Sequence, residues 1–240
     1  MHLLLSGHTR GLGRALAETA AAGGATVYGL ARGRLDPAPA GLRQVQADFA
    51  QPAALDGALD ALVPPDAPLE VVILNAGVLG PVAAMADTSL AALHEVMDVN
   101  VWANKVILDW LVRRAAPPPR QIVLMSSGAS ISGQFGWGAY AMSKAALNML
   151  ARLYAHELPR SHLCALAPGL VATAMQDELA RHSAATFPSL ARLHAARGTP
   201  DMPRAEVAAA RLLERLPALL RFPSGEFVDV RRAFADVPGP

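Results

Sequence analysis

Short runs of apolar residues recur along the chain without alternating with polar positions. The six clearest runs cover residues 2–6, 26–31, 71–75, 122–127, 163–168 and 227–230, and a weaker one covers 42–47. Unbroken apolar runs of this length are typical of strands that are buried on both faces of a parallel sheet. The pattern therefore predicts six such strands, with residues 42–47 as a candidate seventh.

Longer stretches with helical periodicity lie between these runs. They cover residues 11–22, 53–63, 89–114, 138–158 and 205–216. Prolines within residues 64–68 and 117–119 end two of them, because proline cannot continue a helix. The alternation predicts an α/β fold, a doubly wound parallel sheet of the Rossmann type, in a single domain of residues 1–240.

Residues 174–203 depart from this alternation. Three prolines, Pro188, Pro200 and Pro203, interrupt a helical pattern between two well-defined elements. We interpret this insertion as a candidate substrate lid within the domain.

Composition and charge narrow the function classes. The 240 residues are 52% hydrophobic and 17% charged, which favours a globular protein over a disordered one. A net charge of +1 without a long basic run gives no reason to expect a nucleic-acid or membrane partner. With one cysteine, Cys164, and no apparent signal peptide, we expect a cytoplasmic protein without an intrachain disulfide. The seven histidines lack paired metal-ligand spacing, so no metal site is expected.

A glycine-rich turn, SGHTRGLG at residues 6–13, follows the first predicted strand and opens the first predicted helix. At this place in an open α/β sheet, the free amides of a helix N-terminus bind a dinucleotide pyrophosphate. Gly7 can form the tight turn, Gly11 can admit the phosphate, and Gly13 can let the helix pack closely on the sheet. An ordinary glycine-rich turn is the alternative, since such a motif alone is weakly specific.

A second signal comes from the stretch GAYAMSKAAL at residues 138–147. Tyr140 and Lys144 are four positions apart and therefore share one face of the predicted helix. A lysine cation there favours phenolate and lowers the tyrosine pKa toward neutrality. The pair predicts an acid–base unit, although a surface pair is the commoner explanation of this spacing when it occurs alone.

Together, these motifs resemble those of the short-chain dehydrogenase/reductase family, and the resemblance covers nearly the whole chain. Further matching segments follow in the family's order: Asn75-Ala76-Gly77, Asn100, Ser127 and Pro168-Gly169 with Thr173. Ser6 and Leu74 replace a more usual threonine and asparagine. The ending RRAFADVPGP also differs from the family's, which puts in doubt a tetramer contact through that end.

The resemblance implies a set of site residues and a carbonyl or alcohol substrate. The implied catalytic residues are Asn100, Ser127, Tyr140 and Lys144. The implied cofactor-binding residues are Gly7, Thr9, Arg10, Gly11, Leu12, Gly13, Arg32, Asp48, Phe49, Asn75, Ala76, Gly77, Tyr140, Lys144, Pro168, Gly169, Val171 and Thr173. In the family's relay, Tyr140 donates a proton, Ser127 holds the carbonyl oxygen, and Asn100 holds a water in line with Lys144.

The choice of cofactor is predicted from the adenosine end of the motif. Ala31 stands where a carboxylate would bind both ribose hydroxyls of NAD. Arg10 and Arg32 can instead grip a 2′-phosphate with paired charge-assisted hydrogen bonds, so we expect NADP. The alternatives are that Arg32 is a solvated loop charge and that Asp48 is a turn residue and not an adenine contact.

Apolar residues near the motifs suggest a hydrophobic or aromatic substrate. The candidate pocket residues are Gln134, Phe135, Trp137, Leu170, Met175 and Phe187. The pattern is reminiscent of carbonyl, benzil and sepiapterin-type reductases. Two alternatives stay open, a catalytically silent NADP-binding sensor or partner-binding protein and an epimerase or dehydratase of the family's longer branch.

The resemblance also implies a homodimer or homotetramer. The family often pairs the helices around Asn100 and Tyr140 across its subunit contact. The apolar residues Val106, Ile107, Trp110 and Leu111, with Trp102, are compatible with such an interface.

Overall fold

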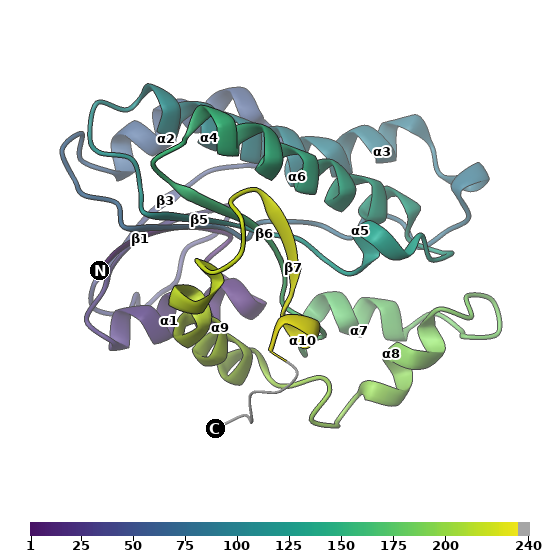
Figure 1. Cartoon of the computed structure of the whole chain (residues 1–240). Helices are drawn as coiled ribbons and strands as arrows, with labels where there is room; N and C mark the ends of the chain where they lie inside the picture. Colours follow the sequence, from purple (N-terminus) through teal and green to yellow (C-terminus); the bar gives the residue numbers. More distant parts are fainter. Residues whose placement is uncertain (235–240) are drawn as a thin grey trace.

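All seven strands join one parallel sheet in the order β3-β2-β1-β4-β5-β6-β7 (Figure 1). The computed structural model describes residues 1–234. The strands are β1 (His2–Ser6), β2 (Thr26–Ala31), β3 (Leu42–Gln46), β4 (Val71–Leu74), β5 (Gln121–Met125), β6 (His162–Ala167) and β7 (Glu226–Asp229). The doubly wound α/β architecture and every expected strand, including the weaker one at 42–47, are confirmed to within about two residues.

Helices cover both faces of the sheet, in two layers that Figure 1 separates clearly. The helices α1 (Gly11–Ala22) and α9 (Ala205–Leu219) pack together on one face. The helices α2 (Leu55–Leu62), α4 (Ala103–Arg113) and α6 (Gly138–Glu157) cover the other. Along β1, Leu3 and Leu5 face the first layer and Leu4 faces the second, because successive strand residues point to opposite sides. This two-sided burial explains the unbroken apolar runs of the sequence.

The order of the strands creates a crevice at the carboxyl ends of β1 and β4. The chain runs from β1 outward to β2 and β3, then crosses back to β4 on the other side of β1. The loops after β1 and β4 therefore diverge to opposite faces. Open α/β sheets bind their ligands at this switch point.

The expected single helix over 89–114 is divided into three parts. Ser89 caps the start of α3 (Leu90–Met97) by accepting a hydrogen bond from Ala92 N. A π-helical turn at Asp98–Trp102 then leads into α4, and Asn100 lies within this turn. A helical repeat of apolar positions cannot reveal the inserted residue of a π turn, which is often found at functional sites.

The insertion at 174–203 contains two short helices, α7 (Ala174–Ala180) and α8 (Leu190–Ala196), that its prolines had concealed. Ala172 N donates to Pro203 O at 2.9 Å, so the segment leaves and rejoins the body of the protein at one place. Leu179 and Leu190 pack against Leu79 and Trp137. The role of this segment as a lid stays a prediction.

The remaining helical segments are short. They are η1 (Pro52–Ala54), η2 (Met85–Asp87), α5 (Ala129–Ser132) and α10 (Val230–Ala233). The ending RRAFADVPGP departs from the family pattern, and its residues 235–240 lie outside the described part of the chain. Within residues 1–234, no helix combines the length and apolarity needed to cross a membrane.

The residues proposed for a subunit contact are largely used within the chain itself. Ile107, Trp110 and Leu111 are buried in the core that α4 forms with the sheet, and Val106 packs against it. Trp110 Nε1 donates to Asp60 Oδ1 of α2 at 2.8 Å. Ile107, Trp110 and Leu111 therefore serve to pack α4 on the sheet, whereas Trp102 is 44% exposed, and the subunit contact itself stays a prediction.

Candidate active site

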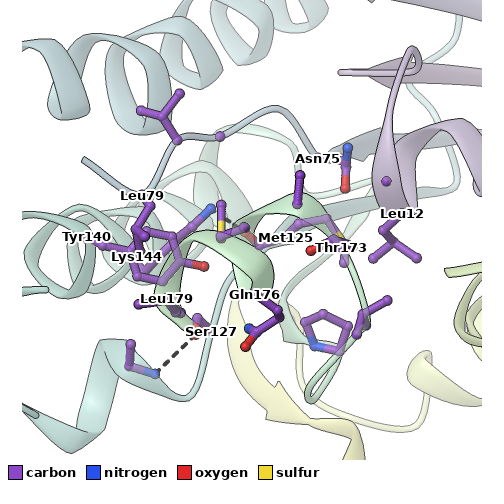
Figure 2. A pocket seen from close by; sticks show the side chains of 18 of the residues that line it. Leu12, Asn75, Leu79, Met125, Ser127, Tyr140, Lys144, Thr173, Gln176 and Leu179 are labelled. Atoms are coloured by element: carbon purple, nitrogen blue, oxygen red, sulfur yellow. Dashed lines mark hydrogen bonds between the residues drawn. The ribbon is translucent and has the colours of Figure 1, made fainter. Parts of the chain in front are cut away.

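A cavity of about 1060 Å³ opens at the carboxyl ends of the strands. It is lined by every residue predicted to bind a cofactor and by Ser127, Tyr140 and Lys144. Figure 2 shows Ser127, Tyr140 and Lys144 toward one end of this cavity and Leu12 toward the other. Residues that are up to 225 positions apart in the chain, from Gly7 to Arg232, thus face one space.

The glycine-rich turn has the backbone that its sequence predicted. Gly7 and Gly11 have positive φ values of 75° and 52°, which other residues adopt only with strain. A Cβ on Gly13 would lie 2.0 Å from Gly7 O and 2.5 Å from Asn75 Nδ2, so only glycine fits there. The first bond of α1 runs from Arg14 N to Arg10 O, which leaves the preceding amides at the cavity. This cradle suits the pyrophosphate of a dinucleotide.

Ser6 ties this turn to the loop after β4. Its buried hydroxyl accepts hydrogen bonds from Asn75 N at 2.9 Å and Ala76 N at 3.0 Å. Asn75 Nδ2 returns the contact by donating to Ser6 O and Gly7 O. The hydroxyl of Ser6 therefore serves as a threonine hydroxyl would, and the exchange from the family pattern preserves this link.

The adenosine end of the cavity is basic. Arg10, Ala31 and Arg32 line it together, and Arg10 and Arg32 are exposed. Asp48 also lines the cavity, while its Oδ1 accepts a hydrogen bond from Ala50 N at 3.1 Å. Asp48 thus acts as a turn residue, and its contact with an adenine stays a prediction.

Tyr140 and Lys144 share one face of α6, as their spacing predicted, but the pKa of Tyr140 differs from expectation. Burial raises the pKa of the phenol, and the neighbouring Ser127 hydroxyl lowers it. Lys144 Nζ lies 5.6 Å from the Tyr140 ring centroid and donates to Met125 O at 2.7 Å. Burial lowers the pKa of Lys144 to about 8. Burial is the larger of the two causes that act on Tyr140, so its pKa is raised and not lowered as expected.

Ser127 is held by a network that the sequence analysis missed. Its Oγ accepts from Ala129 N at 3.2 Å, which leaves the hydroxyl proton available to the cavity. Ser130 Oγ donates to Ser127 O, and Asn148 on α6 binds both Ser126 Oγ and Ser130 Oγ. Asn148 follows Lys144 by four residues, so the helical spacing that identified Tyr140 and Lys144 extends to it.

Asn100 lies outside the cavity lining and is completely buried. Its side chain accepts from Val78 N at 2.8 Å and donates to Val78 O and Ser143 Oγ, both at 2.9 Å. It thereby joins the loop after β4 to α6. Its Oδ1 and Lys144 Nζ both lie against Gly77, within 3.3 Å of the position that a Cβ there would occupy. The water that Asn100 would hold stays a prediction.

The loop after β6 reaches the glycine-rich turn. Gly169 has a φ of 83°, and Pro168, Val171 and Thr173 line the cavity beside it. A Cβ on Gly11 would lie 3.3 Å from Thr173 Cγ2, so the two loops meet. This places the predicted nicotinamide-binding segment against the pyrophosphate cradle.

The candidate substrate residues divide into two groups. Gln134, Trp137, Leu170 and Met175 line the cavity. Phe135 and Phe187 lie outside the lining and pack against each other with ring centroids 5.4 Å apart. These two rings are therefore not part of the cavity wall, and their contact with a substrate stays a prediction.

Several lining residues come from segments that sequence reasoning did not assign to the site. They are Glu95, Val99, Asp229, Arg231 and Arg232, while Arg192 and Leu193 belong to the candidate lid at 174–203. Asp229 ends β7, and its position at the carboxyl end of a parallel strand is the signal that could have found it. Among residues 1–234, no group of three or more His, Cys, Asp or Glu residues is arranged to hold a metal ion.

Comparisons with known proteins agree with this arrangement. The family model for short chain dehydrogenases matches residues 1–184. A benzil reductase ((S)-benzoin forming) of Saccharomyces cerevisiae is 30% identical over 74% of this chain and 74% of its own. One from Bacillus subtilis is 26% identical over 89% of this chain and 92% of its own. The crystal structure of the KRED1-Pglu enzyme has a TM-score of 0.80 and 26% identity, covering 95% of this chain and 99% of that one.

Proposed function

Because the chain belongs to the short-chain dehydrogenase family, we propose that it is an NADPH-dependent oxidoreductase that reduces a hydrophobic ketone, diketone or aldehyde. The observation that carries this proposal is the meeting of Ser127, Tyr140 and Lys144 with the glycine-rich turn around one cavity. Similarity to two benzil reductases supports a carbonyl substrate with aromatic groups. The sensor alternative is not favoured, since it gives no reason for a poised acid beside the cofactor cradle.

The residues around the cavity fit a nicotinamide dinucleotide from end to end. The amides of Gly11, Leu12 and Gly13 would face its pyrophosphate, and Arg10 and Arg32 would bind the 2′-phosphate. Residues 168–173 would hold the carboxamide. The bound cofactor supplies the hydride that reduces the carbonyl carbon.

The protein's own groups would manage the charge that develops on the carbonyl oxygen. Ser127 donates its free proton to this oxygen in a hydrogen bond, while the phenol of Tyr140 transfers a proton to it. The raised pKa of Tyr140 keeps the phenol protonated at neutral pH, which suits the direction of reduction. The Lys144 ammonium then stabilises the phenolate until solvent returns the proton.

The test is the consumption of NADPH and of NADH, followed by absorbance, with a panel of aromatic diketones, ketones, aldehydes and quinones. We expect reduction of at least one aromatic carbonyl with NADPH and slower reduction with NADH. A protein that binds NADPH and reduces none of these would favour the sensor alternative. A protein that binds neither cofactor would contradict the proposal.

Replacing Arg32 by Ala is expected to raise the Kd for NADPH by about 10- to 100-fold and to leave the Kd for NADH unchanged. The change removes charge-assisted hydrogen bonds that only the 2′-phosphate can accept. The measurement is a fluorescence titration with each cofactor. Arg34→Ala is the matched control, because Arg34 lies two residues away and directs its Nη1 toward Gln44 O. Equal losses for both cofactors would argue against Arg32 as the reader of the phosphate.

The rate of reduction is expected to fall as the pH rises above about 8. Because burial lowers the pKa of Lys144 to about 8, its ammonium loses its proton above that pH and no longer stabilises the phenolate. The measurement is the pH profile of kcat/KM for the carbonyl at saturating NADPH. A profile that stays flat to pH 10 would show that the charge on Lys144 does not govern the rate.

A further inference from the structure

Arg231 occupies the cavity wall beside Gly128, the residue after Ser127, at a place that the proposed mechanism leaves without a role. It follows β7 in the short helix α10 and lines the same cavity as Ser127 and Tyr140. Its Nη2 lies 3.1 Å from the position that a Cβ on Gly128 would occupy. Its Cγ and Cδ lie 3.4 and 3.5 Å from the corresponding position on Gly169. The absence of a side chain at Gly128 makes room for the arginine, and Gly169 lies in ordinary van der Waals contact with it.

The guanidinium is fixed in one orientation by Asp229. Arg231 Nε donates to Asp229 Oδ1 at 2.9 Å, and Nη2 donates to Oδ2 at 2.6 Å. The backbone amide of Arg231 also donates to Oδ1, at 3.0 Å. Asp229 is only 8% exposed, so the carboxylate is a rigid support. A planar guanidinium held by two parallel hydrogen bonds presents its remaining donors in a fixed direction.

Donor capacity remains on this guanidinium. Among the residues that the structure describes, Nη1 has no hydrogen-bond partner, and the side chain is 39% exposed. The aligned carboxylate also raises the pKa of Arg231, so the group stays charged throughout the working pH range. A charged donor is therefore available in the cavity that Ser127 and Tyr140 also line.

We propose that Arg231 recognises a second carbonyl-type oxygen on the carbon next to the one that is reduced, so that the preferred substrates are 1,2-dicarbonyl compounds. This inference rests on the proposed function. The reasoning is geometric, since Gly128, which the guanidinium contacts, directly follows Ser127 in the chain. A substrate whose first oxygen binds Ser127 then places an adjacent oxygen toward Arg231.

The reduction of such a substrate is balanced in atoms and electrons. A C–H bond forms at the first carbonyl carbon with the hydride of NADPH, and the π bond to its oxygen breaks. Tyr140 supplies the proton to that oxygen, and NADPH becomes NADP⁺. The second carbonyl keeps its double bond and its hydrogen bond to Arg231, so the product is a 2-hydroxy ketone or a 2-hydroxy acid.

The experiment compares benzil with deoxybenzoin, which has the same two phenyl rings but lacks the second oxygen. Benzoylformate is a third substrate, in which a carboxylate supplies that oxygen. The variants are Arg231→Met and the double change Asp229→Asn with Arg231→Gln, which avoids leaving a buried carboxylate unpaired. Arg160→Gln, at an exposed arginine outside the cavity lining, is the control. Both kcat/KM and, with the NADP⁺-loaded protein, the dissociation constants of the carbonyl compounds are measured.

We expect both Arg231 variants to lower kcat/KM for benzil or benzoylformate by about 10- to 100-fold, the effect of one hydrogen bond to a charged group. The kcat/KM for deoxybenzoin should change by less than about threefold, and Arg160→Gln should preserve the preference for benzil over deoxybenzoin. A loss for benzoylformate alone would identify the acceptor as a carboxylate. If the variants affect benzil and deoxybenzoin equally, the inference is overturned while the proposed function stands. If the unmodified protein reduces none of the three but reduces another carbonyl of the panel with NADPH, the inference is overturned and the proposed function stands. If it reduces no carbonyl of the panel, both are overturned.

Discussion

Replacement of Tyr140 by Phe is expected to lower kcat for carbonyl reduction by about 100- to 10,000-fold, the range contributed by a positioned general acid. The ring still fills its place among Leu79, Trp137 and Leu179, because only the hydroxyl is lost. The Kd for NADPH should therefore change little. The measurement is steady-state turnover at saturating NADPH, combined with a cofactor titration of the same variant.

Tyr154→Phe provides the matched control for this result. Tyr154 lies on the same helix but does not line the cavity. Its hydroxyl donates to Asp109 on α4. Its loss should reduce stability while preserving kcat. If the Tyr140 variant turned over at a rate near that of the unmodified protein, tyrosine would have no part in proton transfer and the proposed mechanism would fail.

Replacement of Gly13 by Ala is expected to destabilise the fold by on the order of 3 kcal/mol or more, as severe overpacking does. The added Cβ would lie 2.0 Å from Gly7 O, a backbone atom in a turn that cannot move without breaking its own contacts. Gly7 N donates to Leu30 O at 2.7 Å, and Asn75 holds Gly7 O from the other side. The measurements are the free energy of unfolding by denaturant, which should fall, and the Kd for NADPH, which should rise.

Gly57→Ala is the control for this substitution. Gly57 lies exposed within α2, and a Cβ there would meet no atom within 4 Å. The same chemical change should therefore stabilise the protein, by about 0.5–1 kcal/mol, because alanine loses less conformational freedom in a helix. If both glycines tolerated alanine equally well, the close approach of α1 to the glycine-rich turn would not be a structural requirement.

The strands and the motif positions could be predicted because their signals are local. An apolar run such as residues 2–6 must be buried on both sides, and a spacing of four places Tyr140 and Lys144 on one helical face. The π turn around Asn100 could not be predicted, because one inserted residue barely alters a helical pattern. The short helices α7 and α8 could not be predicted, because Pro188 lies between them and Pro200 and Pro203 follow α8.

The sequence by itself determined the family, the order of strands and helices, and the residues that form the cradle and the proposed acid–base group. These follow from burial and from backbone rules that act over a few residues. Only the tertiary structure decided which apolar face of α4 is used, that Phe135 and Phe187 cover each other, and that burial raises the pKa of Tyr140. It alone brought Arg231 to Gly128, across about a hundred residues of chain. Such contacts depend on how the ends of separate strands converge, and no local sequence pattern encodes the distance in space between two such residues.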